Sequence, residues 1–507
     1  MSTVEIHKYP NIHVRERDPF MSGEDYKLIN ETVGLYSAVA LLIGTALGMA
    51  IFIVPTQMAA EAGPSITLAI FVAVVPMVLN VLLLLQLGGA IPVAGGIYVY
   101  CSRLVGPFWG VIGVAVPVIA IWSFLLFAAL GFEQYLPVLI DLLPYSFEIP
   151  QLAVVWFLLF TFLAVNYLGI QIAARVQLVL VTVLIVGLLT FIGFGLVNTD
   201  PSNFTPVFPN GAGEPFADGF APFLLAVVLL YVPFQGFSMI IEIGEELEKP
   251  VKNIPRTLGI GMTIVAVLSI GVVIALIGAV PWQELSTADG EAIEGGLAGA
   301  LEGIAPPWAI GFIAISALVA AVTTVNTLFT SYSRTVMRAG RDKIAPEYFA
   351  GIHERFHTPY RAILLIGFPP ILMAPFVDSL DAVLEVDILD WLVVVIVSGI
   401  FIAVMVGGVA LWNLPKIFPQ RYEYSIYKLP MPVLKVVAVG NVVTAALFTL
   451  MVASSAPTAL AVVVGWIVLV ALGYLYRVRR YEKQGIDIRE QMSLLHEHEQ
   501  IGGSNTD

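Results

Sequence analysis

Residues 41–55 read LLIGTALGMAIFIVP and place two glycines inside an otherwise apolar segment. A second apolar segment is interrupted at residues 231–236, which read YVPFQG. Glycine lowers the cost of non-helical backbone angles, and proline removes a backbone donor. Both segments are therefore expected to unwind, and freed backbone groups inside hydrocarbon require surrounding protein or a water-filled cavity. The alternative is close helix packing at Gly44 and Gly48, with a tolerated kink at Pro233.

The composition of the whole chain indicates a membrane environment. Of 507 residues, 58% are hydrophobic and only 12% are charged, which does not suit a water-facing surface. A membrane-spanning helix needs roughly 20 apolar residues. Apolar runs bounded by charged residues, proline or glycine predict about twelve transmembrane helices, near residues 34–60, 65–88, 107–132, 151–169, 174–197, 218–243, 257–280, 308–337, 361–377, 388–412, 433–454 and 457–476. An all-α integral membrane protein is therefore expected.

The two interrupted segments fall in the first and sixth predicted spans. This spacing is typical of an inverted five-plus-five repeat with a central binding site and broken helices 1 and 6. The predicted division of the chain is a cytoplasmic N-terminal segment at 1–33, a transmembrane domain at 34–476 and a cytoplasmic tail at 477–507. Within the transmembrane domain, the sequence predicts repeat one at about 34–197, repeat two at about 218–412 and helices 11 and 12 at about 433–476.

The distribution of charge supports this map. With a cytoplasmic N-terminus, all 24 Lys and Arg residues fall on the cytoplasmic side, as the positive-inside rule requires. Both termini are therefore expected in the cytoplasm, and a multi-pass protein of the plasma membrane is expected. The outer loops are acidic, and residues 291–304 are expected to form an amphipathic helix in one of them. The net charge of −13 argues against a nucleic-acid partner.

Several classes of chemistry find no support in the residues. The single cysteine, Cys101, excludes an intramolecular disulfide and a multi-cysteine metal site. The six histidines show no metal-ligand spacing, and no catalytic constellation or nucleotide-binding glycine loop is found. The protein is therefore not expected to be an enzyme, and no cofactor or metal is expected apart from a coupling ion. The oligomeric state stays open.

Five sequence blocks resemble one known family. The stretch IGTALGMAIFIVP is similar to the first-helix signature of the amino acid, polyamine and organocation transporter superfamily, which is IG, three residues, GxGIF and then P. The resemblance continues in LQLGGAIPVAGGIYVYCSRLVG from Leu85, GFSMIIEIGEELEKPVKNIPRTL from Gly236, NTLFTSYSRTVMRAGRDKIAP from Asn326 and SIYKLPMP from Ser425. The resemblance implies an amino acid permease-like secondary active transporter that works by alternating access.

Three positions depart from the family pattern. Ala50 replaces the third glycine of GxGIF, and Gln86 replaces a glutamate in the second-helix block. Ser238 stands at an acidic position that relatives handling cationic substrates often use. The resemblance therefore implies a small, neutral amino acid rather than a polyamine or arginine. A permease for another organic solute, such as an amine or a nucleobase, and a non-transporting amino acid sensor are the alternatives.

A zwitterionic amino acid can be held at the two breaks without a charged side chain. Its carboxylate would bind N–H groups at the positive end of a half-helix starting near Met49. Its ammonium would bind carbonyls freed around Phe234 and Gln235, with the Ser238 hydroxyl nearby. Phe234 and Phe237 either cap the site as a gate or only pack. The predicted substrate-binding residues are Gly44, Thr45, Gly48, Met49, Ala50, Phe234, Gln235, Gly236, Ser238 and Asn326.

The coupling ion is predicted to be sodium or a proton. In sodium-coupled proteins of this fold, carbonyls of the first helix and hydroxyls of the eighth bind the ion. The resemblance maps these ligands to Gly44, Leu47, Thr323 and Thr324, although threonine hydroxyls also bond to carbonyls one turn back. Some proton-coupled relatives instead carry a lysine on the fifth helix, where the alignment places Leu184.

Glu242 is a second candidate for ion coupling. It lies deeper in the sixth predicted span than the other acidic residues that follow it. A carboxyl at such depth suits a proton relay. The alternative is a side chain exposed in an inner vestibule.

Overall fold

Helices dominate the part of the chain that the computed structural model describes, namely residues 33–91, 95–141, 149–209, 220–244, 247–286, 293, 295–384, 388–425, 427–485 and 487. Inside a bilayer each backbone polar group needs a partner, and an α-helix supplies these partners within one segment. Ten helical segments of the described residues are long and apolar enough to cross a membrane. The expected all-α membrane fold is confirmed.

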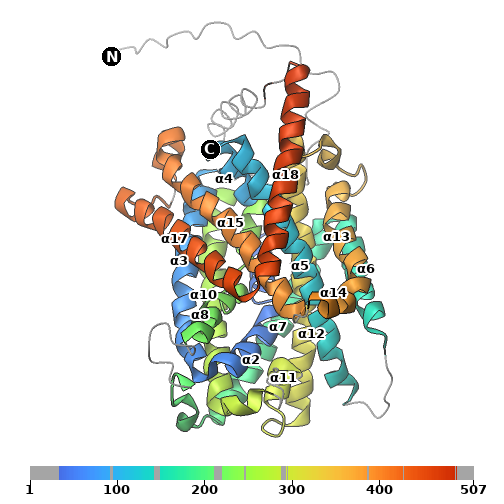
Figure 1. The fold of residues 1–507 in the computed structure, drawn as a ribbon, viewed down its shortest axis with the longest axis vertical. Helices are drawn as coiled ribbons and strands as arrows, with labels where there is room; N and C mark the ends of the chain where they lie inside the picture. The colour runs from blue at the N-terminus through green and yellow to red at the C-terminus, as the bar shows by residue number, and fades with distance from the viewer. Residues whose placement is uncertain are drawn as a thin grey trace.

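The first half of the chain forms seven α-helices that pack as a bundle (Figure 1). They are α1 (Leu35–Ala46), α2 (Ala50–Ala62), α3 (Ile66–Ala90), α4 (Gly96–Leu104), α5 (Pro107–Ile140), α6 (Gln151–Leu168) and α7 (Ile170–Val197). The second half contains α8 (Phe220–Leu229), α9 (Met239–Glu242), α10 (Pro250–Ala279), α11 (Gly296–Ala300), α12 (Pro307–Arg341), α13 (Tyr360–Met373), α14 (Val377–Leu384), α15 (Ile388–Ile417), α16 (Pro419–Glu423), α17 (Met431–Ser455) and α18 (Pro457–Lys483).

The long apolar helices fall where the sequence predicts spans. The first candidate, Leu35–Ala90, contains both the first and the second predicted spans. A shorter apolar helix, Tyr360–Phe376, lies at the predicted ninth span. The exact number of membrane crossings stays a prediction. The division into repeats and tails also stays a prediction.

Two local expectations need correction. The helix expected at residues 291–304 is only five residues long, Gly296–Ala300, among the residues described there. Gly295 has a φ of 75°, and this left-handed backbone directly precedes the helix. The helix α4 was not predicted from the sequence, because its nine residues are too short for a span and carry Arg103.

The centre of the bundle is built on α5 and α12. These helices pack against each other, and α7 and α15 also pack against this pair. The broken helices lie beside it: α1 contacts α7, α10 and α12, and α9 contacts α4 and α12. In Figure 1, α2, α8 and α11 gather at one end of the molecule, and α4 and the C-terminal end of α18 lie at the other.

The charge map predicts which loops face the cytoplasm. In a Cys101→Ser background, Gln283→Cys should react with an impermeant thiol reagent added to intact cells. Glu354→Cys should react only after permeabilisation, because its loop lies on the side that carries Lys and Arg. Both positions are exposed, so accessibility within the protein does not limit labelling. Mass spectrometry or a gel shift measures the labelling, and the reverse pattern would contradict the map.

Candidate substrate and ion site

The first break separates α1 from α2 at Leu47, Gly48 and Met49. Gly48 has a φ of 40°, and a Cβ atom there would lie 2.2 Å from Thr324 Oγ1. Both the backbone angle and the contact therefore require glycine. The amide of Met49 donates a hydrogen bond to Thr324 Oγ1 at 3.2 Å, which ties the break to α12.

The second break lies between α8 and α9. A short 3-10 helix, Val232–Phe234, occupies part of it. Gly236 has a φ of 95°, and a Cβ atom there would lie 2.6 Å from Thr45 Cγ2. The two breaks are therefore in direct contact, and the expectation that both spans unwind is confirmed.

Several backbone groups at the breaks lack partners. Among the described residues outside the helices, the amide of Gly48 donates no hydrogen bond, and the carbonyls of Phe234 and Gln235 accept none. Buried backbone groups without partners are rare in folded proteins. The Gly48 amide lies just before the N-terminal end of α2, where the helix dipole favours an anion. The breaks thus offer a donor for a carboxylate and acceptors for an ammonium group.

The side chain of Gln235 adds a feature that the sequence did not indicate. It is 1% exposed, and neither its Nε2 nor its Oε1 has a hydrogen-bond partner among the described residues. Leaving such a group unsatisfied costs about 1–3 kcal/mol. This amide is therefore a strong candidate for contact with a polar ligand or water.

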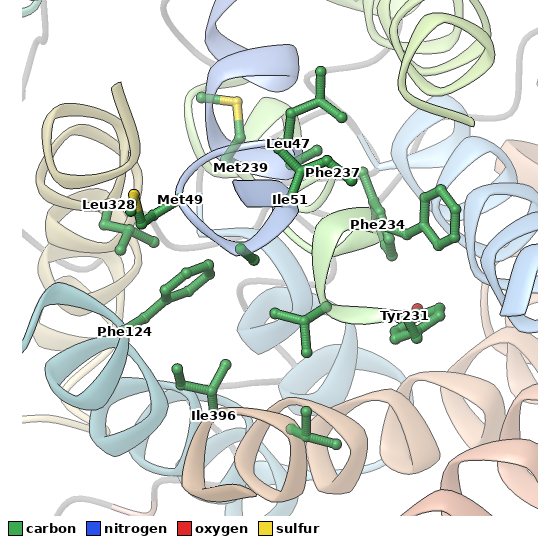
Figure 2. Close-up of a cluster of buried hydrophobic side chains, with 14 of the residues drawn as sticks. Leu47, Met49, Ile51, Phe124, Tyr231, Phe234, Phe237, Met239, Leu328 and Ile396 are labelled. Carbon is green, nitrogen blue, oxygen red and sulfur yellow. The ribbon is translucent and has the colours of Figure 1, made fainter. Parts of the chain in front are cut away.

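Apolar side chains surround the two breaks (Figure 2). They come from α5, α12 and α15 as well as from the breaks, and include Phe124, Leu328, Ile396, Met49, Ile51 and Tyr231. Phe234 and Phe237 are 0% and 4% exposed, and the rings of Tyr231 and Phe234 lie 6.4 Å apart. Both phenylalanines pack within the protein, and their role as a gate stays a prediction.

Oxygen atoms converge between α1 and α12. Thr323 Oγ1 lies 3.1 Å from the carbonyl oxygen of Gly44 and 2.8 Å from that of Ala320. Thr324 Oγ1 lies 3.0 Å from the same Ala320 oxygen. The expected bonding of threonine hydroxyls to the preceding turn is therefore observed, and one hydroxyl also reaches the first break. The Ala320 carbonyl is an additional oxygen that the sequence did not single out.

A glutamine of the fifth predicted span reaches the first break. A Cβ atom on Gly44 would lie 1.9 Å from Gln177 Nε2. The Gln177 Oε1 accepts a hydrogen bond from Asn326 Nδ2 at 3.0 Å. Gln177 of α7 therefore packs against α1 one turn before the break, and the alignment of Leu184 with the lysine position of proton-coupled relatives stays a prediction. A polar side chain in an apolar helix was the signal that could have identified Gln177.

Asn326 lies in the interior of the bundle, as expected. Its Oδ1 accepts a hydrogen bond from Asn166 Nδ2 of α6 at 3.1 Å. Together with the bond to Gln177, this joins α12 to α6 and α7. The Thr45 hydroxyl donates to the carbonyl of Leu41 at 2.8 Å. Direct contact of either side chain with substrate stays a prediction.

An ion-pair cluster lies at the C-terminal end of α12. Arg103 Nη1 lies 2.8 Å from Asp342 Oδ2, and Arg338 Nε lies 3.6 Å from Asp342 Oδ1. The hydroxyl of Tyr98 donates to Asp342 at 2.6 Å. Burial alone would raise the pKa of Asp342, but the charges of Arg338 and Arg103 hold it below its usual value.

This arrangement defines a class of protein. Two broken helices meet inside a helical membrane bundle, and backbone groups without partners line their junction, as in secondary transporters. The family model for amino acid permeases matches residues 33–473. The chain belongs to the amino acid permease family.

Characterised relatives cover most of the chain. The branched-chain amino acid permease BcaP of Bacillus subtilis is 25% identical over 400 residues, which is 75% of this chain and 82% of that protein. The large neutral amino acids transporter small subunit 2 of Mus musculus is 28% identical over 420 residues, which is 80% of this chain and 75% of that protein. The methylthioribose transporter of Bacillus subtilis is 25% identical over 369 residues, which is 69% of this chain and 76% of that protein.

A substitution at Gly48 tests the first break. Gly48→Leu should strongly weaken substrate binding, because the side chain clashes with Thr324 and displaces the Gly48 amide. Loss of one hydrogen bond to a charged group, about 1.5–3 kcal/mol, corresponds to a roughly ten- to hundredfold loss of affinity. Gly465→Leu is the matched control, since no atom lies within 4 Å of a Cβ atom placed there. Ligand binding by both purified variants, compared by thermal shift, measures the effect. Normal binding by Gly48→Leu would move the site elsewhere.

Proposed function

We propose that this protein is a secondary active transporter that moves a small neutral amino acid across the plasma membrane by alternating access. The observation that carries the proposal is that, among the described residues, two neighbouring breaks hold an unpartnered amide at Gly48 and unpartnered carbonyls at Phe234 and Gln235. These groups match the two charged ends of a zwitterion. No charged side chain is needed at the breaks, so the substrate's own charges are neutralised by dipoles.

The surroundings favour an apolar substrate side chain. Apolar side chains pack around the breaks (Figure 2), and Ser238 stands where relatives that handle cationic substrates often have a carboxylate. Relatives named as branched-chain and large neutral amino acid transporters agree with this choice. The positive-inside distribution of Lys and Arg supports cytoplasmic termini.

Another organic solute is the second candidate. The relative named as a methylthioribose transporter has a different type of substrate. The unpartnered amide of Gln235 would also suit a hydroxylated or otherwise polar solute. A non-transporting sensor is distinguished from both by binding without flux.

Sodium is the proposed coupling ion. Carbonyl oxygens of Gly44 and Leu47 would bind it together with the hydroxyls of Thr323 and Thr324. The hydrogen bond of the Thr323 hydroxyl to the Gly44 carbonyl brings two of these proposed ligands together. Neutral oxygen atoms suit a hard monovalent cation. Exchange or proton coupling is the alternative source of energy.

Uptake by purified protein in proteoliposomes tests the function. Radiolabelled leucine, valine and phenylalanine should accumulate, and arginine and putrescine should not. A thermal-shift screen should rank the same compounds, since a ligand at 100 times its Kd stabilises the folded state by about 2.7 kcal/mol. Binding without accumulation would indicate a sensor. Accumulation of a nucleobase, amine or methylthioribose alone would favour the second candidate.

Replacement of sodium by choline tests the coupling ion. At fixed pH and membrane potential, this replacement should reduce uptake sharply. Thr323→Val should raise the half-saturating sodium concentration roughly tenfold, as expected for a loss of about 1.4 kcal/mol. Thr324 is left unchanged because it also binds the amide of Met49. Thr182→Val is the control, since that exposed hydroxyl bonds only within α7. Uptake by the wild type that is indifferent to sodium would refute the assignment.

A further inference from the structure

Glu242 is a buried carboxyl at the inner end of the second broken helix. It is the last residue of α9 and is only 1% exposed. The Ser238 hydroxyl, one turn earlier, donates a hydrogen bond to Glu242 Oε1 at 3.3 Å. Its other oxygen, Oε2, has no hydrogen-bond partner in the described parts of the chain. The alternative of a side chain exposed in an inner vestibule does not fit this burial.

The carboxyl of Glu242, on α9, lies against α4 and α12. From α4, a Cβ atom on Gly96 would lie 2.5 Å from Glu242 Cγ, so the backbone there touches the side chain. Tyr100 of α4 and Tyr332 of α12 lie close enough to interact electrostatically with it. The hydroxyl of Ser331 on α12 is within hydrogen-bonding reach. All of these neighbours are uncharged.

The nearby cations are engaged elsewhere. Arg103 of α4 and Arg338 of α12 pair with Asp342. Arg334 of α12 donates to the carbonyl of Thr330 and to the Ser333 hydroxyl at 3.0 Å. Among the described residues, α1 and α10 also pack against α9 but supply no charged partner to Glu242. A buried carboxylate without a counter-charge costs several kcal/mol, so the arrangement stabilises the neutral acid.

We propose that Glu242 is a proton-binding site whose proton is released to the cytoplasm when α9 separates from α4 and α12. A proton binds to the carboxylate oxygen itself and needs no further ligand, which suits a carboxyl with uncharged neighbours. Separation would hydrate the carboxyl and favour its ionised form. The O–H bond then breaks, and the proton passes to cytoplasmic water. The inference rests on the proposed alternating-access cycle and adds a proton to it, at a site distinct from that of Thr323.

Substrate-driven proton movement tests the site. Proteoliposomes are prepared with the wild-type protein in the membrane and a pH-sensitive dye inside. Leucine added outside should acidify their interior. Glu242→Gln should lose at least about nine-tenths of this acidification. Its leucine uptake should no longer respond to a pH gradient, but its leucine counterflow should remain measurable. Glu61→Gln is the control, because that carboxyl lies on α2 at an exposed position and should keep the signal. Equal acidification by Glu242→Gln and the wild type, or none by the wild type, would overturn the proposal.

A second measurement does not depend on transport and therefore still applies if Glu242→Gln is inactive. Infrared difference spectra of the purified wild type, recorded between acidic and alkaline pH, should contain a carbonyl band of a protonated carboxylic acid. One component of this band should be missing from the spectrum of Glu242→Gln and kept in that of Glu61→Gln. Identical spectra for the wild type and Glu242→Gln would overturn the proposal. Failure of wild-type counterflow with every amino acid would instead refute the proposed function, and the infrared result would still decide the protonation of Glu242.

Discussion

The hydrogen bond between the Met49 amide and Thr324 Oγ1 joins the first break to α12, and the candidate site depends on this contact. An unwound turn in a membrane protein is tolerated only if its backbone groups find partners within the protein. Thr324 satisfies one amide, and the neighbouring amide of Gly48 has no partner among the described residues. Gly236 then allows the second break to approach Thr45. The candidate binding site thus consists of backbone groups that the broken helices do not satisfy by themselves.

Much of this arrangement could be predicted from the sequence. Apolar length set the helix positions, and the glycines and proline at 41–55 and 231–236 marked both breaks. These signals are local, because backbone preference and hydrophobicity are properties of a residue and its near neighbours. The start of α2 directly after Met49 was predicted for the same reason.

Contacts between distant segments could not be predicted in this way. Gln177 faces Gly44 rather than lipid only because α7 has a particular rotation about its axis. The amide of Gln235 lacks a partner only because nothing in the neighbouring helices reaches it. The short helix α4, which encloses Glu242, has no hydrophobic signature long enough to identify it. In each case the missing information is the packing of two helices, which one sequence does not contain.

The two proposed coupling sites share one face of α12. Thr324 contacts the first break, and Ser331, seven residues later, lies beside Glu242. Seven residues make nearly two helical turns, a rise of about 10 Å, so the two side chains point to the same side of α12. A movement of α1 and α9 away from this face would open both sites together. Sodium at Thr323 and a proton at Glu242 would then be bound and released in the same conformational step. The two sites would be coupled through this movement alone, without a direct contact between them.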